Sequence, residues 1–138
     1  MGDGCPFHNK VTAEEAKEAK RHYPEAKLLA HPECRDAVLQ LADFVGSTSA
    51  IMEYAKNSSD KEFIIGTELS IAGHLSYACP DKTFYALSKE LFCHDMRITT
   101  LMDVYRSLLG TGGVVMEMDS DLMQKSRKCI DEMIRLGE

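Results

Sequence analysis

Residues 27–34 read KLLAHPEC, a short apolar run that ends in a histidine, a proline, a carboxylate and a thiol. Similar runs occur in FVGSTS (44–49), EFIIGTE (62–68) and TFYAL (83–87). Short apolar runs bounded by glycine, serine or proline are typical of buried strands. We therefore expect strands over 27–31, 44–45, 62–65 and 83–87.

Helical segments separate these strands, over 37–42, 51–55 and 69–77. Strands that alternate with helices in this way form a parallel sheet with helices on its faces. The predicted fold class is therefore α/β, a three-layer arrangement in which a parallel sheet of about four strands is flanked by helices.

The two ends of the chain lie outside this alternation. Thr12 and Glu15 fit a capping box, which predicts a helix from there to Tyr23. Helices are also expected over 98–109 and 119–136, and because no strand follows either, we interpret them as a C-terminal helical appendage. The expected organisation is an N-terminal segment (1–24), an α/β domain (25–95) and C-terminal helices (96–138).

Composition argues against several classes of partner. The 138 residues carry a formal net charge of −6 with scattered lysine and arginine, whereas a phosphate backbone requires a cationic surface. No apolar run of 18 residues occurs, which argues against a membrane span. The opening MGDGCPFHNK lacks the apolar stretch of a secretory signal, and Pro6 stands where a myristoylation motif needs serine or threonine. We therefore expect a cytoplasmic protein that binds neither nucleic acid nor membrane.

Five cysteines are widely spaced along the chain. Their odd number and the absence of any CxxC argue against a disulfide framework and against a zinc finger. In a reducing compartment they are either free thiols or ligands of a metal whose donors meet only in the folded protein. Cys79 and Cys129 are interpreted as structural thiols.

Polar side chains follow each predicted strand at its carboxyl end. In open parallel sheets, the loops at this edge form the ligand site. We therefore expect one edge of the sheet to gather His31, Glu33, Ser47, Thr48, Thr67, Glu68 and Cys93. Of these, Glu68 is expected to open a helix rather than to take part in catalysis.

The most distinctive of these positions each have two interpretations. The GSTS turn (46–49) could bind a phosphate or carboxylate at a helix N-terminus, but Thr48 or Ser49 acting only as an N-cap is the more common case. His31 and Glu33 could bind an anion and move a proton. Equally, they could be a backbone-bonded histidine and a first-turn carboxylate favoured by the helix dipole. Local sequence leaves these alternatives open.

Five motifs taken in order resemble quinolinate synthase, the NadA family: CPFH (5–8), HPEC (31–34), ADFVGSTS (42–49), EFIIGTE (62–68) and LFCHDMRITTL (91–101). The resemblance extends from about Cys5 to Leu109 and, more weakly, to the end of the chain. Several motifs in one order are far more specific than any single motif, and ADFVGSTS joined to HPEC is the strongest part.

The resemblance implies an enzyme of NAD biosynthesis, a condensing transferase. It would join iminoaspartate and dihydroxyacetone phosphate to give quinolinate, with loss of phosphate and two waters. It also implies three similar α/β domains around a central [4Fe–4S] cluster. Three cysteines, one from each domain, would hold that cluster and leave one iron open to bind substrate as a Lewis acid.

For the cluster, the resemblance implies that Cys5 of CPFH and Cys93 of CHDM are two of the three ligands. His94 follows Cys93 where the family pattern leads us to expect proline. Cys34 lies next to the reactive part of HPEC, but it is not expected to be a ligand.

For the substrates, the resemblance implies that His8 and His31 are histidines that face the bound molecule. Glu33 corresponds to the acid–base carboxylate, and Ser47 with Thr48 to the turn that binds a phosphate or carboxylate. By this interpretation, catalysis in HPEC depends on its histidine and its glutamate.

The resemblance begins partway along the family pattern. The family's first domain, most of its second domain and the first cluster cysteine have no counterpart here, so we expect a fragment that is inactive on its own. The helices after Ile98 resemble a segment that packs on the first domain. We expect their uncovered apolar faces to promote self-association, which size-exclusion chromatography would detect.

Two other functions remain open from the residues alone. One is a stand-alone α/β module that uses the GSTS turn to bind phosphate or carboxylate and has no iron–sulfur cluster. The other is a structural α/β domain whose cysteines are incidental.

Overall fold

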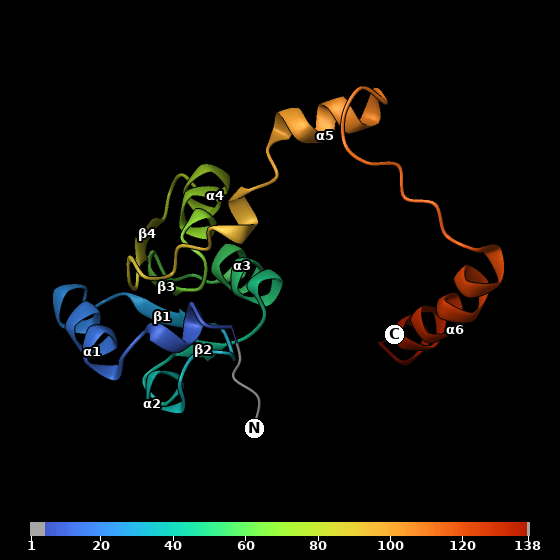
Figure 1. The fold of residues 1–138 in the computed structure, drawn as a ribbon. Coiled ribbons are helices and arrows are strands. Elements are labelled where there is room, and N and C mark those ends of the chain that lie inside the picture. Colours follow the sequence, from blue (N-terminus) through green and yellow to red (C-terminus); the bar gives the residue numbers. More distant parts are fainter. Residues whose placement is uncertain (1–4, 138) are drawn as a thin grey trace. The chain divides into compact units, whose positions relative to one another are not determined.

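The computed structural model of the chain describes residues 5–137. It divides into two compact units, and the division falls between Met96 and Arg97. The first unit contains the sheet and its helices, and the second contains the two C-terminal helices (Figure 1).

The first unit is built on a sheet of four parallel strands. These strands are β1 (Lys27–Ala30), β2 (Phe44–Val45), β3 (Glu62–Gly66) and β4 (Thr83–Ala86), in the spatial order β2-β1-β3-β4 (Figure 1). The central strands β1 and β3 are buried along almost their whole length, which explains why they are continuous apolar runs. The predicted α/β class with a four-stranded parallel sheet is confirmed.

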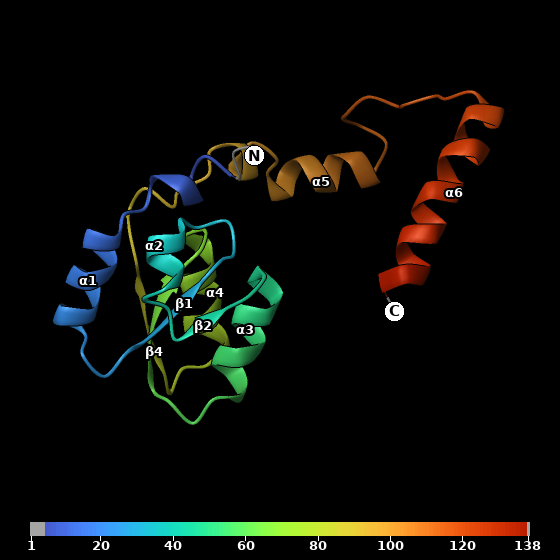
Figure 2. The same ribbon diagram turned by 90° about the horizontal axis from the view of Figure 1, so that it is seen from below.

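Helices cover both faces of this sheet, as Figure 2 shows from below. They are α1 (Ala13–His22), α2 (Asp36–Leu39), α3 (Thr48–Asn57) and α4 (Ser70–Ala78). Because successive strand side chains point to opposite faces, the core forms two clusters. One cluster includes Ala16 of α1, Leu28 and Ile64 of the strands, and Val38 of α2. The other includes Leu29, Phe63 and Ile65 of the strands, Ile51 and Ala55 of α3, and Leu75 of α4.

Local hydrogen bonds determine where the helices of the first unit begin and end. The capping box of α1 is confirmed, because the N–H of Glu15 donates to Oγ1 of Thr12 (3.2 Å) and the N–H of Thr12 donates to Oε2 of Glu15 (2.8 Å). The helix expected over 37–42 is wrong in extent, because α2 ends at Leu39. The next residues form i→i−3 bonds, which tighten the end of a helix into a turn.

The second unit consists of α5 (Leu101–Leu108) and α6 (Ser120–Gly137). The first of these begins later than the expected residue 98, because Thr100 and Asp103 form a capping box. Residues 97–137 include no buried side chain, and Leu101 and Leu108 are 86% and 82% exposed. Self-association through these apolar faces stays a prediction. Among residues 5–137, no helix has the length and apolar content needed to cross a bilayer.

Gly66 provides a test of how β1 pairs with β3. A Cβ added there would lie 3.0 Å from the carbonyl oxygen of Leu29 and 3.2 Å from Cα of Ala30. Because these are backbone atoms of a paired strand, we expect Gly66→Ala to lower the free energy of unfolding by about 1–3 kcal/mol. Urea unfolding followed by circular dichroism measures this change.

The matched control is Gly73→Ala in α4. A Cβ at this exposed helical position meets nothing within 4 Å, so helix propensity predicts a gain in stability of about 0.5–1 kcal/mol. If Gly66→Ala were as stable as the unsubstituted chain, the close approach of the two strands at this point would be contradicted.

Candidate functional site

The loops that follow the strands meet at the carboxyl edge of the sheet. Ala30 pairs with Gly66, and the N–H of His31 extends the ladder by donating to the carbonyl of Gly66 (3.1 Å). On the other side of β1, the N–H of Gly46 donates to the carbonyl of Ala30 (3.1 Å). The residues after β1, β2 and β3 therefore lie side by side, as the sequence predicts.

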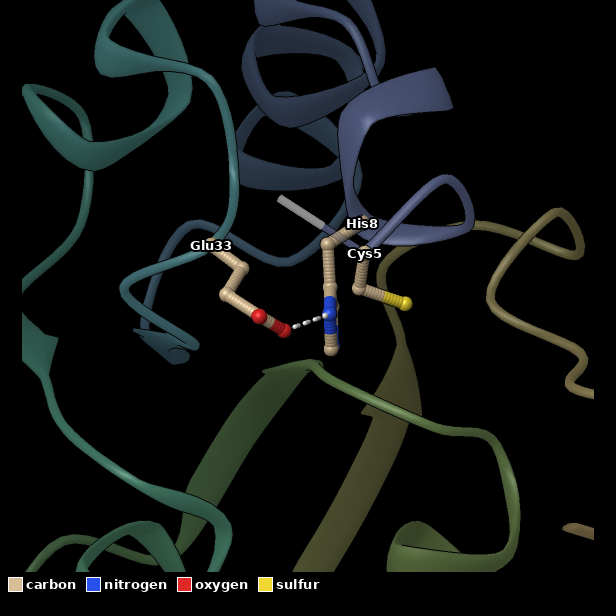
Figure 3. Close-up of side chains that lie close together, drawn as sticks. All are labelled: Cys5, His8 and Glu33. Atoms are coloured by element: carbon tan, nitrogen blue, oxygen red, sulfur yellow. Dashed lines mark hydrogen bonds and ion pairs between the residues drawn. The ribbon is translucent and has the colours of Figure 1, made fainter. Parts of the chain in front are cut away.

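A hydrogen-bonded series of four side chains crosses this edge. His8, from the 3-10 turn η1 (His8–Lys10), has its Nδ1 3.2 Å from Oε2 of Glu33 (Figure 3). Its Nε2 lies 3.3 Å from Oγ1 of Thr67. That oxygen lies 3.4 Å from Oγ1 of Thr48. We call this series the Glu33–His8–Thr67–Thr48 chain, and it joins η1 to residues that follow three of the four strands.

The Glu33–His8–Thr67–Thr48 chain determines which ring nitrogen of His8 carries hydrogen. Burial, followed by the neighbouring His31, lowers the pKa of His8 below its usual 6.5, although Glu33 opposes this shift. The ring is therefore neutral at pH 7, and because a carboxylate only accepts, Nδ1–H donates to Glu33. The unprotonated Nε2 then accepts from the hydroxyl of Thr67, and the oxygen of Thr67 accepts from the hydroxyl of Thr48.

His31 stacks against the ring of His8. The ring centroids are 4.4 Å apart and the planes differ by 6°. The backbone N–H of Glu33 donates to Nδ1 of His31 (3.2 Å), so a neutral His31 carries its hydrogen on Nε2. Its Nδ1 therefore makes no hydrogen bond to the Glu33 carboxylate 3.5 Å away. His31 instead restricts the orientation of the His8 ring by stacking on it, and it fixes the backbone at Glu33 by accepting the N–H of that residue.

Cys5 and Cys93 line one small cavity beside this series. The cavity has a volume of about 50 Å³, and its lining is completed by Phe7, His8, Glu68, Leu91 and Met96. Two thiols on one cavity are suitable soft donors for an iron–sulfur cluster. The space holds only a few waters, so a cluster would require the cavity to widen and a further thiolate to arrive. The donor set therefore fits a cluster in part.

Cys34 is not among the residues that line this cavity. Its side chain is 5% exposed, and its Sγ lies 3.6 Å from the carbonyl oxygen of Gly66. Burial raises the pKa of the Cys34 thiol to about 11. A thiol that stays protonated at neutral pH is a poor metal ligand, which supports the expectation that Cys34 is not a cluster ligand.

Helix α3 begins in the GSTS turn, and its N-cap lies one residue earlier than expected. Oγ of Ser47 accepts from the N–H of Ala50 (3.3 Å), so Ser47 is the N-cap of α3, and the expected N-cap at Thr48 or Ser49 is wrong. The hydroxyl of Thr48 is thereby left to contact Thr67. The two adjacent hydroxyls thus serve different partners.

Two residues that follow β3, Thr67 and Glu68, make more contacts within the candidate site than the sequence indicates. Thr67 is 1% exposed and contacts both His8 and Thr48, although only its position after Gly66 pointed to the site. Glu68 accepts from the N–H of Ser70 (2.8 Å) in the first turn of α4, as expected for a helix-opening acid. It also lines the cavity of the two cysteines.

This arrangement is suited to moving protons. The Glu33 side chain is 44% exposed, whereas that of His8 is 11% exposed, so a ligand at this edge reaches the carboxylate first. His8 lies beside the carboxylate and orients it through a hydrogen bond. An oriented, reachable carboxylate is the usual requirement for a general acid or base.

Comparison with known proteins identifies the family. The family model described as Quinolinate synthetase A protein matches residues 1–135. The quinolinate synthase of Clostridium kluyveri is 48% identical over 105 residues, which cover 76% of this chain and 35% of that protein. The quinolinate synthases of Caldicellulosiruptor bescii and Clostridioides difficile are each 40% identical, over 96% and 97% of this chain and 44% of each relative. The chain thus spans less than half the length of these relatives, and with a match along nearly all of its own length it belongs to the quinolinate synthetase A protein family.

Proposed function

We propose that this chain supplies the acid–base part of a quinolinate synthase active site. The reaction is the condensation of iminoaspartate with dihydroxyacetone phosphate to quinolinate, in NAD biosynthesis, and its setting is the cytoplasm. The observation that carries the proposal is the Glu33–His8–Thr67–Thr48 chain beside the cavity lined by Cys5 and Cys93. Membership of the family supports the same assignment.

Glu33 is proposed as the group that moves protons. Loss of two waters requires that protons leave carbon and nitrogen atoms of the substrate and reach departing oxygens. A carboxylate can do both when it is reachable, and Glu33 is half-exposed at the sheet edge. The Nδ1–H of His8 fixes one carboxylate oxygen, so that the other can face the substrate.

The neighbouring groups are proposed to bind and orient the substrates. His8 and His31 form a stacked pair, and this pair is proposed to contact the bound substrate. Ser47 and Thr48 lie at the N-terminus of α3, where backbone amides and the helix dipole favour a phosphate or carboxylate. Oγ of Ser47 only accepts as the N-cap, so its O–H remains able to donate to a phosphate or carboxylate, whereas the O–H of Thr48 already donates to Thr67.

Cys5 and Cys93 are proposed to hold a [4Fe–4S] cluster together with one further cysteine. When bound, the cluster supplies an open iron that acts as a Lewis acid on a substrate oxygen. The chain's own contribution is two thiolates on one cavity and an apolar lining from Phe7 and Leu91 that limits access of water. The third thiolate is proposed to come from the portion of the relatives that this chain does not span.

Complementation tests the catalytic assignment. The 138-residue chain is mixed anaerobically, with iron and sulfide, with a separately expressed portion of the Caldicellulosiruptor bescii relative that this chain does not match. We expect quinolinate to form only with both parts present. We also expect Glu33→Gln to lower kcat by about 10²–10⁴-fold, because a general acid–base is removed.

The matched control is Glu53→Gln, which makes the same change at an exposed position of α3. Its activity should equal that of the unsubstituted chain. Full activity of Glu33→Gln in the complemented enzyme would contradict the role of Glu33, and quinolinate formation that does not need this chain would contradict the proposed function.

Anaerobic reconstitution with iron and sulfide tests the cluster ligands in the complemented protein. We expect a brown protein whose colour is lost in Cys5→Ser and Cys93→Ser, because each removes a thiolate. Cys129→Ser, at an exposed position of α6, is the control and should keep the colour. Thermal stabilisation by inorganic phosphate without iron uptake would instead favour the stand-alone binding module.

A further inference from the structure

Three different metal donors converge where the N-terminal turn meets the loop after β1. They are Sγ of Cys5, a ring nitrogen of His8 and a carboxylate oxygen of Glu33, and all lie within 4.8 Å of one another (Figure 3). The first two come from η1 and the residues before it, and the third comes from a loop 25 residues further along the chain. The fold, and not the local sequence, therefore brings this set together.

We propose that Cys5, His8 and Glu33 bind a single divalent transition-metal ion of the Zn²⁺ or Co²⁺ type. This mononuclear site shares Cys5 with the iron–sulfur cluster assigned above to Cys5 and Cys93, so the ion and the cluster are alternative occupants of the chain and do not bind together. The inference does not rest on the proposed function, because it concerns only donors within this chain.

The chemistry of the donors favours this class of ion. A thiolate, an imidazole and a carboxylate are the three ligand types that zinc uses in proteins. The thiolate and carboxylate together carry two negative charges, which balance the charge of a divalent ion. Three protein ligands leave the fourth position of a tetrahedron for water or for a substrate oxygen.

The geometry requires only a small closure. Bond lengths of about 2.0–2.3 Å place tetrahedral ligand atoms about 3.3–3.8 Å apart. Nδ1 of His8 and Oε2 of Glu33 are already 3.2 Å apart. Sγ of Cys5 lies within 4.8 Å of its partners, so the spacing of a tetrahedral site requires a closure of at most about 1–1.5 Å.

Thr67 supplies the support that a metal-bound histidine needs. Such a histidine usually donates its second ring N–H to an oxygen, which fixes the ring. In the metal-free chain the hydrogen of His8 is on Nδ1 and the hydroxyl of Thr67 donates to Nε2. Metal binding at Nδ1 moves that hydrogen to Nε2, and Thr67 then accepts it.

Cys5 is shared between two donor sets that can be separated by mutation. Cys93 lines the cavity with Cys5 but is not in the Cys5–His8–Glu33 set. Glu33 is in that set but does not line the cavity. A mononuclear ion therefore depends on Glu33 and not on Cys93, whereas a cluster depends on Cys93 and not on Glu33.

Anaerobic titration with Co²⁺ tests the site in the full 138-residue chain. We expect one equivalent of Co²⁺ to give visible bands of four-coordinate cobalt together with a thiolate-to-cobalt band in the near ultraviolet, all removed by added Zn²⁺. Cys5→Ser should remove the thiolate band. Glu33→Gln and His8→Ala should each weaken the dissociation constant at least tenfold, and Thr67→Val by about 10–100-fold.

Cys93→Ser and Cys129→Ser are the controls and should keep the wild-type affinity. Circular dichroism of each variant confirms that it folds. If a variant of a buried residue such as Thr67→Val unfolds, Glu33→Gln still tests the proposal, because the Glu33 side chain is half-exposed. The proposal is overturned if the unsubstituted chain gives no thiolate band, if Glu33→Gln binds as well as wild type, or if Cys93→Ser weakens binding as much as Cys5→Ser. The Co²⁺ titration tests only the metal site. A failure to form quinolinate in the complementation experiment would instead count against the proposed function.

Discussion

The parallel pairing of β1 with β3 through Ala30 and Gly66 is the constraint on which the candidate site depends. Gly66 has no side chain, so its backbone can approach Leu29 closely and its carbonyl can accept from the N–H of His31. A slip of one residue would turn the side chains of one strand to the opposite face. It would also separate the loop of Glu33 from Thr67, and the hydrogen bonds through His8 could not form. Core packing and site geometry are therefore set by the same register.

The sheet edge could be predicted because its signal is local. Buried parallel strands are continuous apolar runs, and the polar residues that follow each run mark its carboxyl end. That pattern alone predicts His31, Glu33 and Thr48 at this edge. The position of His8 could not be derived in the same way, since it precedes the sheet in the chain and reaches Glu33 only after the whole unit folds. The family resemblance, and not the pattern, pointed to it.

Other differences arise where two local arrangements have nearly equal energy. Serine and threonine are both good N-caps, so the sequence GSTS cannot determine that the hydroxyl of Ser47, rather than Thr48, reaches the N–H of Ala50. The early end of α2 has a similar cause, because a tight i→i−3 turn competes with one more helical turn. Cys5 lines the cavity, whereas Cys34 is buried in the core. The sequence does not distinguish these two environments, because burial depends on the tertiary structure.

The side chains of the site form one hydrogen-bonded series with a defined direction, through Glu33, His8, Thr67 and Thr48. Nitrogen-15 NMR of histidine-labelled, metal-free protein at pH 7 tests it most directly, with the His8 signals assigned by their loss in His8→Gln. We expect a neutral ring with its hydrogen on Nδ1, because the Glu33 carboxylate can only accept and Thr67 donates to Nε2. A neutral ring with its hydrogen on Nε2 would contradict it.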